Sequence, residues 1–304
     1  MWAADIEIDL GLAQRLIASQ FPLVSLGRIA PFGNGWDNTA FLVDDTFVFR
    51  FPRRRVAIPL LEREIALLPL LVSHVPLVIP APCLVGVRTT DYPSPFAAYR
   101  LIRGATAGSL ILAPEVRAGL AAPLGAFLRA LHAIDPAPFL DRGLPFDELG
   151  RLDHEKRLAL TRERLRAHEA DGVAGRWLRL LTWLEEHPPV APPADERRLV
   201  HGDLYARHVI LDSDARPVGV IDWGDIHFGD PALDIAIAFL LMPAQAHAAF
   251  RAAYGAIDER TWNAARYRAI YHAVLEYDYG VRSGDVEMRG MGSIALGMLD
   301  HAER

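Results

Sequence analysis

The stretch that most constrains the fold is residues 199–223, LVHGDLYARHVILDSDARPVGVIDW. It contains short apolar runs separated by the polar segment SDAR, which is typical of a tight turn between two strands. His201 and Asp203 precede the first strand, His208 begins it, and Asp222 closes the second. Apolar strands do not hold such groups for packing alone, so this hairpin is the candidate functional centre.

Two spacings in this stretch indicate its chemistry. Asp203 and His208 lie five residues apart, and Asp222 follows Asp203 by 19 residues. This is the spacing of the catalytic and metal loops of a protein-kinase-like phosphotransferase, where H-x-D-x-x-x-x-N is followed by an Asp that ends the next strand. The alternative is that Asp203 caps a turn and Asp222 merely ends a strand. Both residues at this spacing, with His201 and Gly202 in place, favour the functional interpretation.

Phosphoryl transfer explains why these residue types are needed. The acceptor hydroxyl must be aligned and must lose its proton, which suits a carboxylate that accepts a hydrogen bond, here Asp203. A divalent metal ion must neutralise the β- and γ-phosphates, which requires hard ligands on a rigid hairpin. Asp222 is the candidate metal ligand, and His208 is a candidate for a second ligand.

The composition limits the class of protein. With 304 residues, of which 51% are apolar, the chain is long enough for two lobes with a large core. The net charge of −6 argues against a nucleic-acid partner. The single cysteine, Cys83, fits a reducing cytosol. No apolar run approaches the roughly 20 residues of a membrane span, and the N-terminus lacks a signal-peptide pattern. We therefore expect a cytoplasmic protein without a membrane partner; its oligomeric state stays open.

The N-terminal third predicts a small antiparallel sheet. A helix is expected over residues 9–20, a three-stranded meander over 23–54 and a second helix over 58–73. The runs VIPAPCLVGV and FAAYRLI add two strands, which makes five. Because a strand ends in RLIRG and GATAGS follows, we place the lobe boundary near residue 103, between lobes of residues 1–103 and 104–304.

Four residues of this sheet region are candidates for phosphate binding. Gly33 and Gly35 lie between the first two strands, where a turn without Cβ atoms brings backbone N–H groups close to an anion. An ordinary hairpin turn, with no role in binding, also has glycines at such positions. Arg50 projects from the apolar strand VFRFP and can hold a phosphate bidentately, unless it only joins the following arginines in a solvated patch. Glu64 lies against the apolar face of the next helix and is expected to pair with this cation; the alternative is an exposed glutamate.

From residue 114 on, the chain is predicted to be mostly helical. A long buried helix is expected over 114–134, and one or two helices over 152–187. PPVAPP is a stiff linker into the central hairpin, and GDPALDIAIAFLL is a helix after it. Further helices are expected near residues 246–254, 258–282 and 286–302.

These motifs together resemble the aminoglycoside/macrolide phosphotransferase family, the antibiotic kinases. HGDLYARHVILD, followed by GVIDWGD and GDPALDIA, is most similar to the macrolide phosphotransferase branch, in which a His also stands where most kinases have Asn. GNGWDNTAFLV, VFRFPRR, REIALL and AYRLIRG fall in the family's order, whereas the C-terminal third is similar only in helical character. The resemblance implies a protein-kinase-like α+β fold with a five-stranded N-terminal nucleotide-binding lobe and a larger helical lobe.

The resemblance also implies roles at matching positions. Asp203 would be the catalytic base, and His208 and Asp222 would ligate Mg²⁺, or Mn²⁺ because imidazole suits softer ions. Arg50 stands where the family usually has Lys. The nucleotide, GTP or ATP, would be held by Arg50 and Glu64 at its phosphates, by Tyr99 as the residue that guards the base pocket, and by backbone groups of Arg100 and Ile102 at the base.

The acceptor site is expected in the helical lobe. In YHAVLEYDYG, Tyr271 lies on an apolar-aromatic stripe, with Glu276 and Asp278 on adjoining faces, and Asp225 follows the central hairpin. This sparse acidic set suits a wide apolar ring with one tertiary amine better than a polyamine. Plain helix packing explains the stripe equally well.

The function that the resemblance implies is transfer of phosphate from GTP or ATP to a hydroxyl of a macrolide-type antibiotic. The same fold serves kinases of aminoglycosides and of small amino alcohols or sugars, which stay open as alternatives. A nucleotide-binding pseudokinase is the alternative outside enzymes. The presence of both the base and the metal ligand argues against it.

Overall fold

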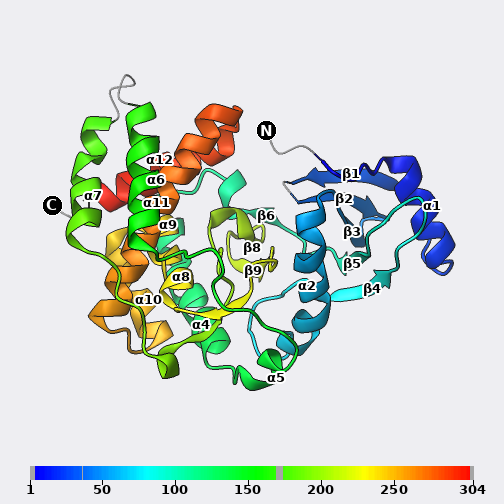
Figure 1. Cartoon of the computed structure of the whole chain (residues 1–304), viewed down its shortest axis with the longest axis horizontal. Coiled ribbons are helices and arrows are strands. Elements are labelled where there is room, and N and C mark those ends of the chain that lie inside the picture. Colours follow the sequence, from blue (N-terminus) through cyan, green and yellow to red (C-terminus); the bar gives the residue numbers. More distant parts are fainter. Residues whose placement is uncertain (1–3, 36, 169–173, 302–304) are drawn as a thin grey trace.

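The computed structural model describes residues 4–35, 37–168 and 174–301 of the chain. A small lobe built on a sheet lies beside a larger helical lobe (Figure 1). The small lobe contains the predicted five-stranded antiparallel sheet, in the order β1-β2-β3-β5-β4. Its strands are β1 (Ile29–Asn34), β2 (Asn38–Val43), β3 (Phe47–Pro52), β4 (Pro82–Gly86) and β5 (Phe96–Arg100).

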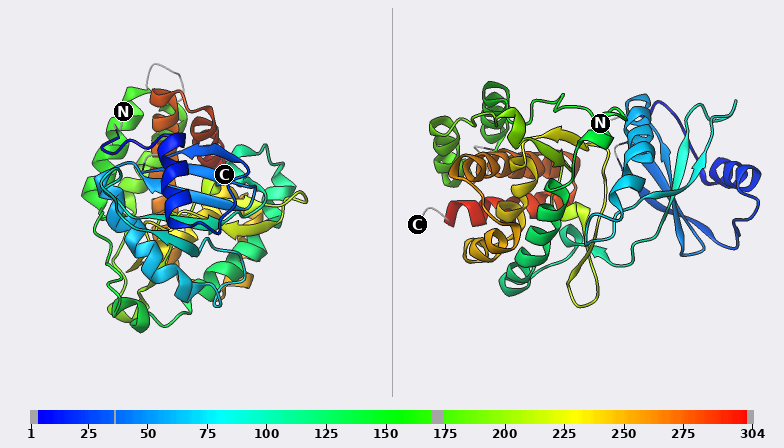
Figure 2. Two further views of the ribbon diagram at one scale, coloured as in Figure 1. Left: turned by 90° about the vertical axis from the view of Figure 1, so that its right-hand side faces the viewer. Right: turned by 90° about the horizontal axis from the view of Figure 1, so that it is seen from below.

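The two faces of this sheet have different partners because side chains alternate along each strand. On β3, Phe49 and Phe51 are fully buried in an aromatic cluster, against which α1 (Leu10–Gln20) packs. Figure 2 shows α1 on the outer side of the sheet, away from the helical lobe. Arg50 lies between these two residues in the strand, so it points to the opposite face, toward the other lobe.

Helix α2 (Ile58–Leu71) covers that inner face and joins the lobes. Leu61 packs with Tyr99 of β5, whereas Leu68 belongs to the hydrophobic core of the helical lobe. In addition, Arg63 Nη1 donates to the carbonyl of Gly224, at 3.2 Å. The helix is therefore held from both sides, which fixes the direction of the side chains that it presents to the space between the lobes.

The central stretch contains the predicted hairpin and one additional strand, β7 (Arg198–Val200). The strands β8 (Val209–Leu211) and β9 (Pro217–Val220) are antiparallel, and β6 (Ala105–Thr106) extends their sheet. The strand β7 instead pairs with β10 (His227–Gly229) in a separate two-stranded sheet. The loop between β7 and β8 ends in a 3-10 turn, η5 (Ala206–His208).

The larger lobe is helical, as predicted, but two expected helices are divided. The segment 114–134 breaks at Leu120 because Pro123 has no N–H to bond the carbonyl four residues earlier, and its ring clashes there. The segment 229–241 breaks at Ala236, where the sequence has no proline or glycine that would predict a break. Residues 169–173 and 302, which fall in expected helices, lie outside the described residues. The helices are α3 (Pro114–Gly119), α4 (Ala121–His132), α5 (Ala137–Leu140), α6 (His154–Ala167), α7 (Ala174–Glu186), α8 (Ala232–Ile235), α9 (Ile237–Leu241), α10 (His247–Tyr254), α11 (Glu259–Ser283) and α12 (Val286–His301).

Helix α11 is the central element of this lobe. It packs against α6, α8, α9 and α12, and buried residues occur on all of its faces. Within the described part of the chain, no helix combines the length and apolarity that crossing a membrane requires.

Candidate active site

A cleft of about 420 Å³ lies where the two lobes meet the central hairpin. Its walls come from β1 to β3, α2, the end of β5, the loop after β7 and the segment after β9. The sequence-predicted residues that line it are Gly33, Gly35, Arg50, Glu64, Tyr99, Arg100, Ile102, Asp203, His208, Asp222 and Asp225.

A buried carboxylate holds the loop that carries Asp203. The two oxygens of Asp234, on α8, accept the backbone N–H groups of His201 and Gly202, each at 2.8 Å. Burial alone would raise the pKa of Asp234, but the hydrogen bond from His132 and the neighbouring imidazole hold it below its usual value. Gly202 has φ +86°, and a Cβ there would lie 2.6 Å from the carbonyl oxygen of Asp225. Only glycine fits this turn, which aims the next residue at the cleft.

Asp203 is surrounded by basic side chains. Its Oδ1 accepts a hydrogen bond from Nη2 of Arg268, on α11, at 2.9 Å. Burial alone would raise the pKa of Asp203, but the charges of His272, Arg268, His208 and Arg151 lower it overall. Because its pKa is lowered, the carboxylate is ionised at neutral pH. The side chain is 29% exposed, so it can accept a hydrogen bond from a hydroxyl in the cleft.

His208 and Asp222 converge on one point of the cleft. Nδ1 of His208 lies 2.8 Å from the carbonyl oxygen of Asp203, so it carries a proton and donates there. Nε2 lies 3.3 Å from Asp222 Oδ2; it donates to this oxygen when the imidazole is protonated and offers a lone pair when the imidazole is neutral. Asp222 has φ +65° and is half exposed toward the cleft. Burial would raise its pKa, but His208 and Arg50 hold it well below the usual value.

This donor pair fits a divalent metal ion. An imidazole nitrogen and a carboxylate oxygen face each other across a space open to the cleft, as two ligands of one ion would. Among the described residues, no group of three or more His, Cys, Asp or Glu side chains gathers for this purpose. Phosphate oxygens and water would therefore complete the coordination, which is common for Mg²⁺ in phosphotransfer.

The imidazole at position 208 leads to a testable pH effect. Burial would lower the pKa of His208, but the hydrogen bond and charge of Asp222 raise it overall. A protonated imidazole cannot ligate a metal, so the Mg²⁺ concentration for half-maximal rate should rise as the pH falls through this raised pKa. We expect His208→Asn to stay active with Mg²⁺ and to lose most of this pH dependence, because the amide oxygen does not titrate. The measurement is a set of Mg²⁺ titrations at several pH values. An inactive but folded variant would mean that the imidazole does more than hold metal.

The expected ion pair between β3 and α2 is present. Nη1 of Arg50 lies 3.1 and 2.9 Å from the two carboxylate oxygens of Glu64, and the Tyr99 hydroxyl donates to Oε2 of Glu64 at 2.8 Å. Nη2 of Arg50 also lies 3.6 Å from Oδ1 of Asp222. Burial would lower the pKa of the Arg50 guanidinium, but these anions raise it. A fixed cation therefore stands between the lobes beside the candidate metal ligand.

The glycine turn gives weaker support to phosphate binding. Gly35 N–H donates to the carbonyl of Asn38 at 3.0 Å, as in an ordinary hairpin. A Cβ at Gly33 would meet nothing within 4 Å, so lack of space does not require glycine at that position. Both residues nevertheless border the cleft on the side of the sheet.

The side of the cleft around Asp203 is built around two guanidinium groups. Arg151, just before α6, bonds Asp147 at 2.8 Å and Asp225 at 2.5 Å. Burial and the nearby charge of Asp203 raise the pKa of Asp225. Arg268 pairs with Asp203, and Arg151 is shared by Asp147 and Asp225, so all three carboxylates on this side are engaged by these two arginines.

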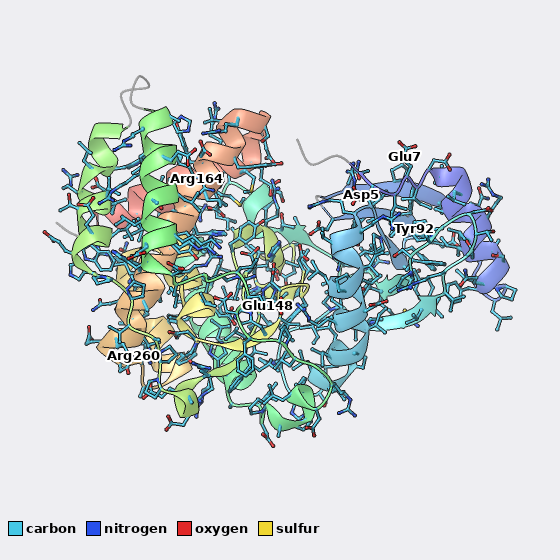
Figure 3. The ribbon with its side chains drawn as sticks, viewed as in Figure 1. Asp5, Glu7, Tyr92, Glu148, Arg164 and Arg260 are labelled. Carbon is cyan, nitrogen blue, oxygen red and sulfur yellow. The ribbon has the colours of Figure 1, made fainter. Side chains whose placement is uncertain are left out.

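Two residues expected to line the acceptor site lie elsewhere. The hydroxyl of Tyr271, which is 2% exposed, donates to the backbone carbonyl of Arg151. Asp278 is 6% exposed and lies 3.0 Å from His168 Nε2 and 3.6 Å from Nε of Arg164. Figure 3 shows Arg164 in the helical lobe. Both fasten α11 to its neighbours, so their positions support helix packing rather than acceptor binding. Glu276 is buried beside a second cavity, of about 390 Å³, which the segment 107–112, α11 and α12 enclose.

Comparison with known proteins identifies the family. A model described as the phosphotransferase enzyme family, APH, matches residues 28–270. The chain belongs to this family. It is therefore a phosphotransferase with the protein-kinase-like fold, as the resemblance implied.

Solved structures of similar fold cover nearly the whole phosphotransferase. The GDP complex of wild-type aminoglycoside 2'-phosphotransferase-IIIa is 24% identical, with a TM-score of 0.69, over 96% of this chain and 98% of that one. The macrolide 2'-phosphotransferase MphH from Brachybacterium faecium is 22% identical, with a TM-score of 0.60, over 95% and 97%. A curated relative, the uncharacterized protein YcbJ of Bacillus subtilis (strain 168), is 38% identical over 39 residues only; the match spans 13% of each chain.

Three residues near the cleft of the phosphotransferase were not singled out from the sequence. Asp234 could have been found from the sequence, because it lies in the GDPALD motif that follows the central hairpin. Arg151 and Arg268 had none: one lies in a loop and the other on a helix with charged residues on several faces. Their part in the site depends on contacts across the helical lobe.

Proposed function

We propose that the phosphotransferase transfers the γ-phosphoryl group of GTP or ATP to a hydroxyl of a macrolide-type small molecule. The observation that carries this proposal is the convergence of three groups on one cleft of about 420 Å³. They are the carboxylate of Asp203, the donor pair His208 and Asp222, and the ion pair of Arg50 with Glu64. The GDP complexes among the structures of similar fold support a nucleotide in this cleft.

Each group has a task in the proposed reaction. Asp203 accepts the hydrogen bond of the acceptor hydroxyl and takes its proton as the new O–P bond forms. The bond between the γ-phosphorus and the β–γ bridging oxygen breaks in the same transfer, and GDP or ADP leaves. Asp222 and Nε2 of His208 would hold Mg²⁺, which neutralises phosphate charge when bound. Arg50, oriented by Glu64 and Tyr99, holds the phosphates in line with the hydroxyl. Tyr99, Arg100 and Ile102 form the side of the cleft proposed for the base.

The charges around Asp203 favour an acceptor with few positive charges. Asp225 is paired with Arg151, and Asp278 lies outside the cleft. Arg151 and Arg268 both add positive potential beside Asp203. These ion pairs leave little unpaired carboxylate charge for a polyammonium ligand, whereas an apolar ring with a single amine needs less of it. This supports the macrolide type over the aminoglycoside type.

We expect erythromycin to bind and to be phosphorylated, and kanamycin to bind at least about tenfold more weakly, which corresponds to ~1.4 kcal/mol of missing charge pairing. The measurement is titration calorimetry at low and high salt, beside phosphorylation assays with GTP and ATP that include small amino alcohols. Tight kanamycin binding that weakens steeply with salt, without erythromycin binding, would overturn the macrolide assignment and leave the phosphotransferase assignment intact.

We expect GTP to be at least as good a donor as ATP. Tyr99 is 2% exposed, and its hydroxyl is held by Glu64, so its ring is a fixed wall of the cleft that narrows the inner base pocket. Competition kinetics with both nucleotides measures the preference. Tyr99→Ala should shift it toward ATP, and Tyr99→Phe, which keeps the ring, is the matched control. A strong preference of the wild type for ATP, unchanged in Tyr99→Ala, would contradict this assignment.

A further inference from the structure

The loop that carries Asp203 also carries an aromatic side chain to which the proposed reaction assigns no task. Tyr205 lies between this base and His208 in the chain, and it lines the nucleotide cleft. Its backbone is extended, with φ −150°. Leu204 and Ala206 on either side are buried in the hydrophobic core of the helical lobe. Because side chains alternate along an extended chain, the side chain of Tyr205 turns the other way, toward the cleft.

The ring of Tyr205 is held in place by two imidazoles. Its centroid lies 4.3 Å from that of His208, at an interplanar angle of 61°, and 5.0 Å from that of His272 on α11, at 63°. Both contacts are edge-to-face, an arrangement that aromatic rings prefer. The ring also packs against the core of the helical lobe. These contacts fix the direction of the hydroxyl without using the hydroxyl itself.

The hydroxyl of Tyr205 has no hydrogen-bond partner among the residues that the structure describes. Tyr99, on the opposite side of the same cleft, differs in this respect, because its hydroxyl donates to Glu64 at 2.8 Å. The buried side-chain atoms that lack a partner in the described parts of the chain do not include the Tyr205 oxygen, so this oxygen is open to the cleft. A donor that is fixed in direction and open to the cleft is suited to a ligand atom there.

The charges around the hydroxyl keep it a neutral donor. Burial, and then the charges of Asp203, Glu276 and Asp222, raise the pKa of Tyr205 well above its usual value, and Arg207 offsets only part of this effect. The phenol therefore keeps its proton at neutral pH. It can donate a hydrogen bond to an anion, and it does not serve as a base.

Phosphoryl transfer brings negative charge to this part of the cleft. The group that moves carries its charge on three outer oxygens, and it travels toward the hydroxyl beside Asp203. It therefore approaches the carboxylates of Asp203 and Asp222. Arg50 meets the phosphates from the sheet, whereas Tyr205 belongs to the loop of the helical lobe. A fixed neutral donor on that loop offsets the repulsion and adds no further anion.

We propose that the hydroxyl of Tyr205 donates a hydrogen bond to an outer oxygen of the γ-phosphoryl group during transfer, which makes Tyr205 a second catalytic residue of this loop. The inference rests on the proposed function for the nucleotide in the cleft, and it is independent of which acceptor is used. The bond from the γ-phosphorus to the bridging oxygen breaks and the bond to the acceptor oxygen forms. Asp203 takes the proton of the acceptor, and the proton of Tyr205 stays on its own oxygen.

One substitution removes the hydroxyl and keeps the ring. Tyr205→Phe preserves the contacts with both imidazoles. Tyr277→Phe is the matched control, because Tyr277 is also partly buried and its ring lies 5.2 Å from that of His168. Within the described residues its hydroxyl likewise has no hydrogen-bond partner, but Tyr277 does not line the cleft. Thermal unfolding verifies that both variants keep their fold.

The kinetic readout is the transfer of phosphate from GTP and from ATP, to erythromycin and, in its absence, to water. Tyr205→Phe should lower kcat of both reactions by about tenfold or more, the effect of losing one hydrogen bond to a charged group, with KM of erythromycin preserved. Tyr277→Phe should resemble the wild type. A raised KM of erythromycin with an unchanged rate of hydrolysis would assign the hydroxyl to the acceptor and overturn the proposal.

A second readout does not depend on turnover. GDP or ADP with Mg²⁺ and aluminium fluoride mimics the phosphoryl group in transfer, and titration calorimetry compares its affinity with that of the diphosphate alone. Tyr205→Phe should weaken the fluoride complex by about tenfold or more and leave the affinity of the diphosphate unchanged. If erythromycin is not phosphorylated but the complex weakens in this way, the macrolide assignment fails and the proposal for Tyr205 stands. A complex of equal affinity in Tyr205→Phe and the wild type, or no complex in the wild type, would overturn it.

Discussion

Replacing Asp203 by alanine should lower kcat by about 10²–10⁴-fold, the range found when one general base is removed. The charges of His272, Arg268 and His208 keep the pKa of Asp203 low, so the wild-type carboxylate is ready to take a proton at neutral pH. Nucleotide affinity should change little, because Arg50, Glu64 and Asp222 are untouched. Single-turnover phosphorylation measures the chemical step, and titration with GTP measures binding.

The fold of this variant needs a control, because Arg268 is 7% exposed at its side chain and loses its partner in Asp203→Ala. Asp203→Asn keeps an oxygen for Arg268 and removes only the basicity, so it should be as inactive and better folded. Asp214→Asn, at an exposed turn position of the same hairpin, should behave as the wild type. A rate near that of the wild type in Asp203→Asn would remove Asp203 from the role of base.

Asp222→Asn should raise the Mg²⁺ concentration for half-maximal rate by about tenfold or more. Loss of even an outer-shell partner typically costs about 10–100-fold in metal affinity, and here a charged hard ligand becomes neutral. Asparagine is the suitable replacement because Asp222 has φ +65°, a conformation that Asn tolerates better than most residues. Mg²⁺ titrations of the initial rate at constant pH give the result.

Two observations separate loss of metal binding from general damage. At saturating Mg²⁺, Asp222→Asn should recover part of its rate, whereas Asp203→Asn should not recover at any concentration. Thermal unfolding should show an intact fold, since Asp222 is half exposed and its partners Arg50 and His208 keep other contacts. A wild-type Mg²⁺ requirement in this variant would exclude Asp222 as a metal ligand.

Much of the small lobe could be predicted from local patterns. The alternation in VFRFP placed Arg50 opposite the two phenylalanines, and helical periodicity placed Glu64 on the apolar face as its expected partner. The structure contains this pair, and Glu62 instead meets Arg88 on the exposed side of α2. Such predictions succeed because a strand has a period of two and a one-sided helix has a single apolar stripe.

The break of the segment 114–134 could have been anticipated from the same kind of evidence. Pro123 lies inside the apolar pattern that was assigned to one helix, and its missing N–H ends the hydrogen-bond ladder at that point. The apolar periodicity continues through Leu124 and Phe127, so the pattern alone extends across the break. Backbone hydrogen bonding decided the boundary here, and side-chain patterning did not.

By itself, the sequence determined the protein-kinase-like fold and the local order Asp203, His208, Asp222, because short-range spacing on one hairpin sets their geometry. Only the tertiary structure decided which charges surround Asp203. Arg268 reaches it from α11, 65 residues away along the chain. That helix is buried on all sides, so its periodicity does not show which face meets the cleft, the second cavity or α6. The packing of α11 against its neighbours places Arg268 on Asp203, Glu276 at the second cavity and Asp278 against α6.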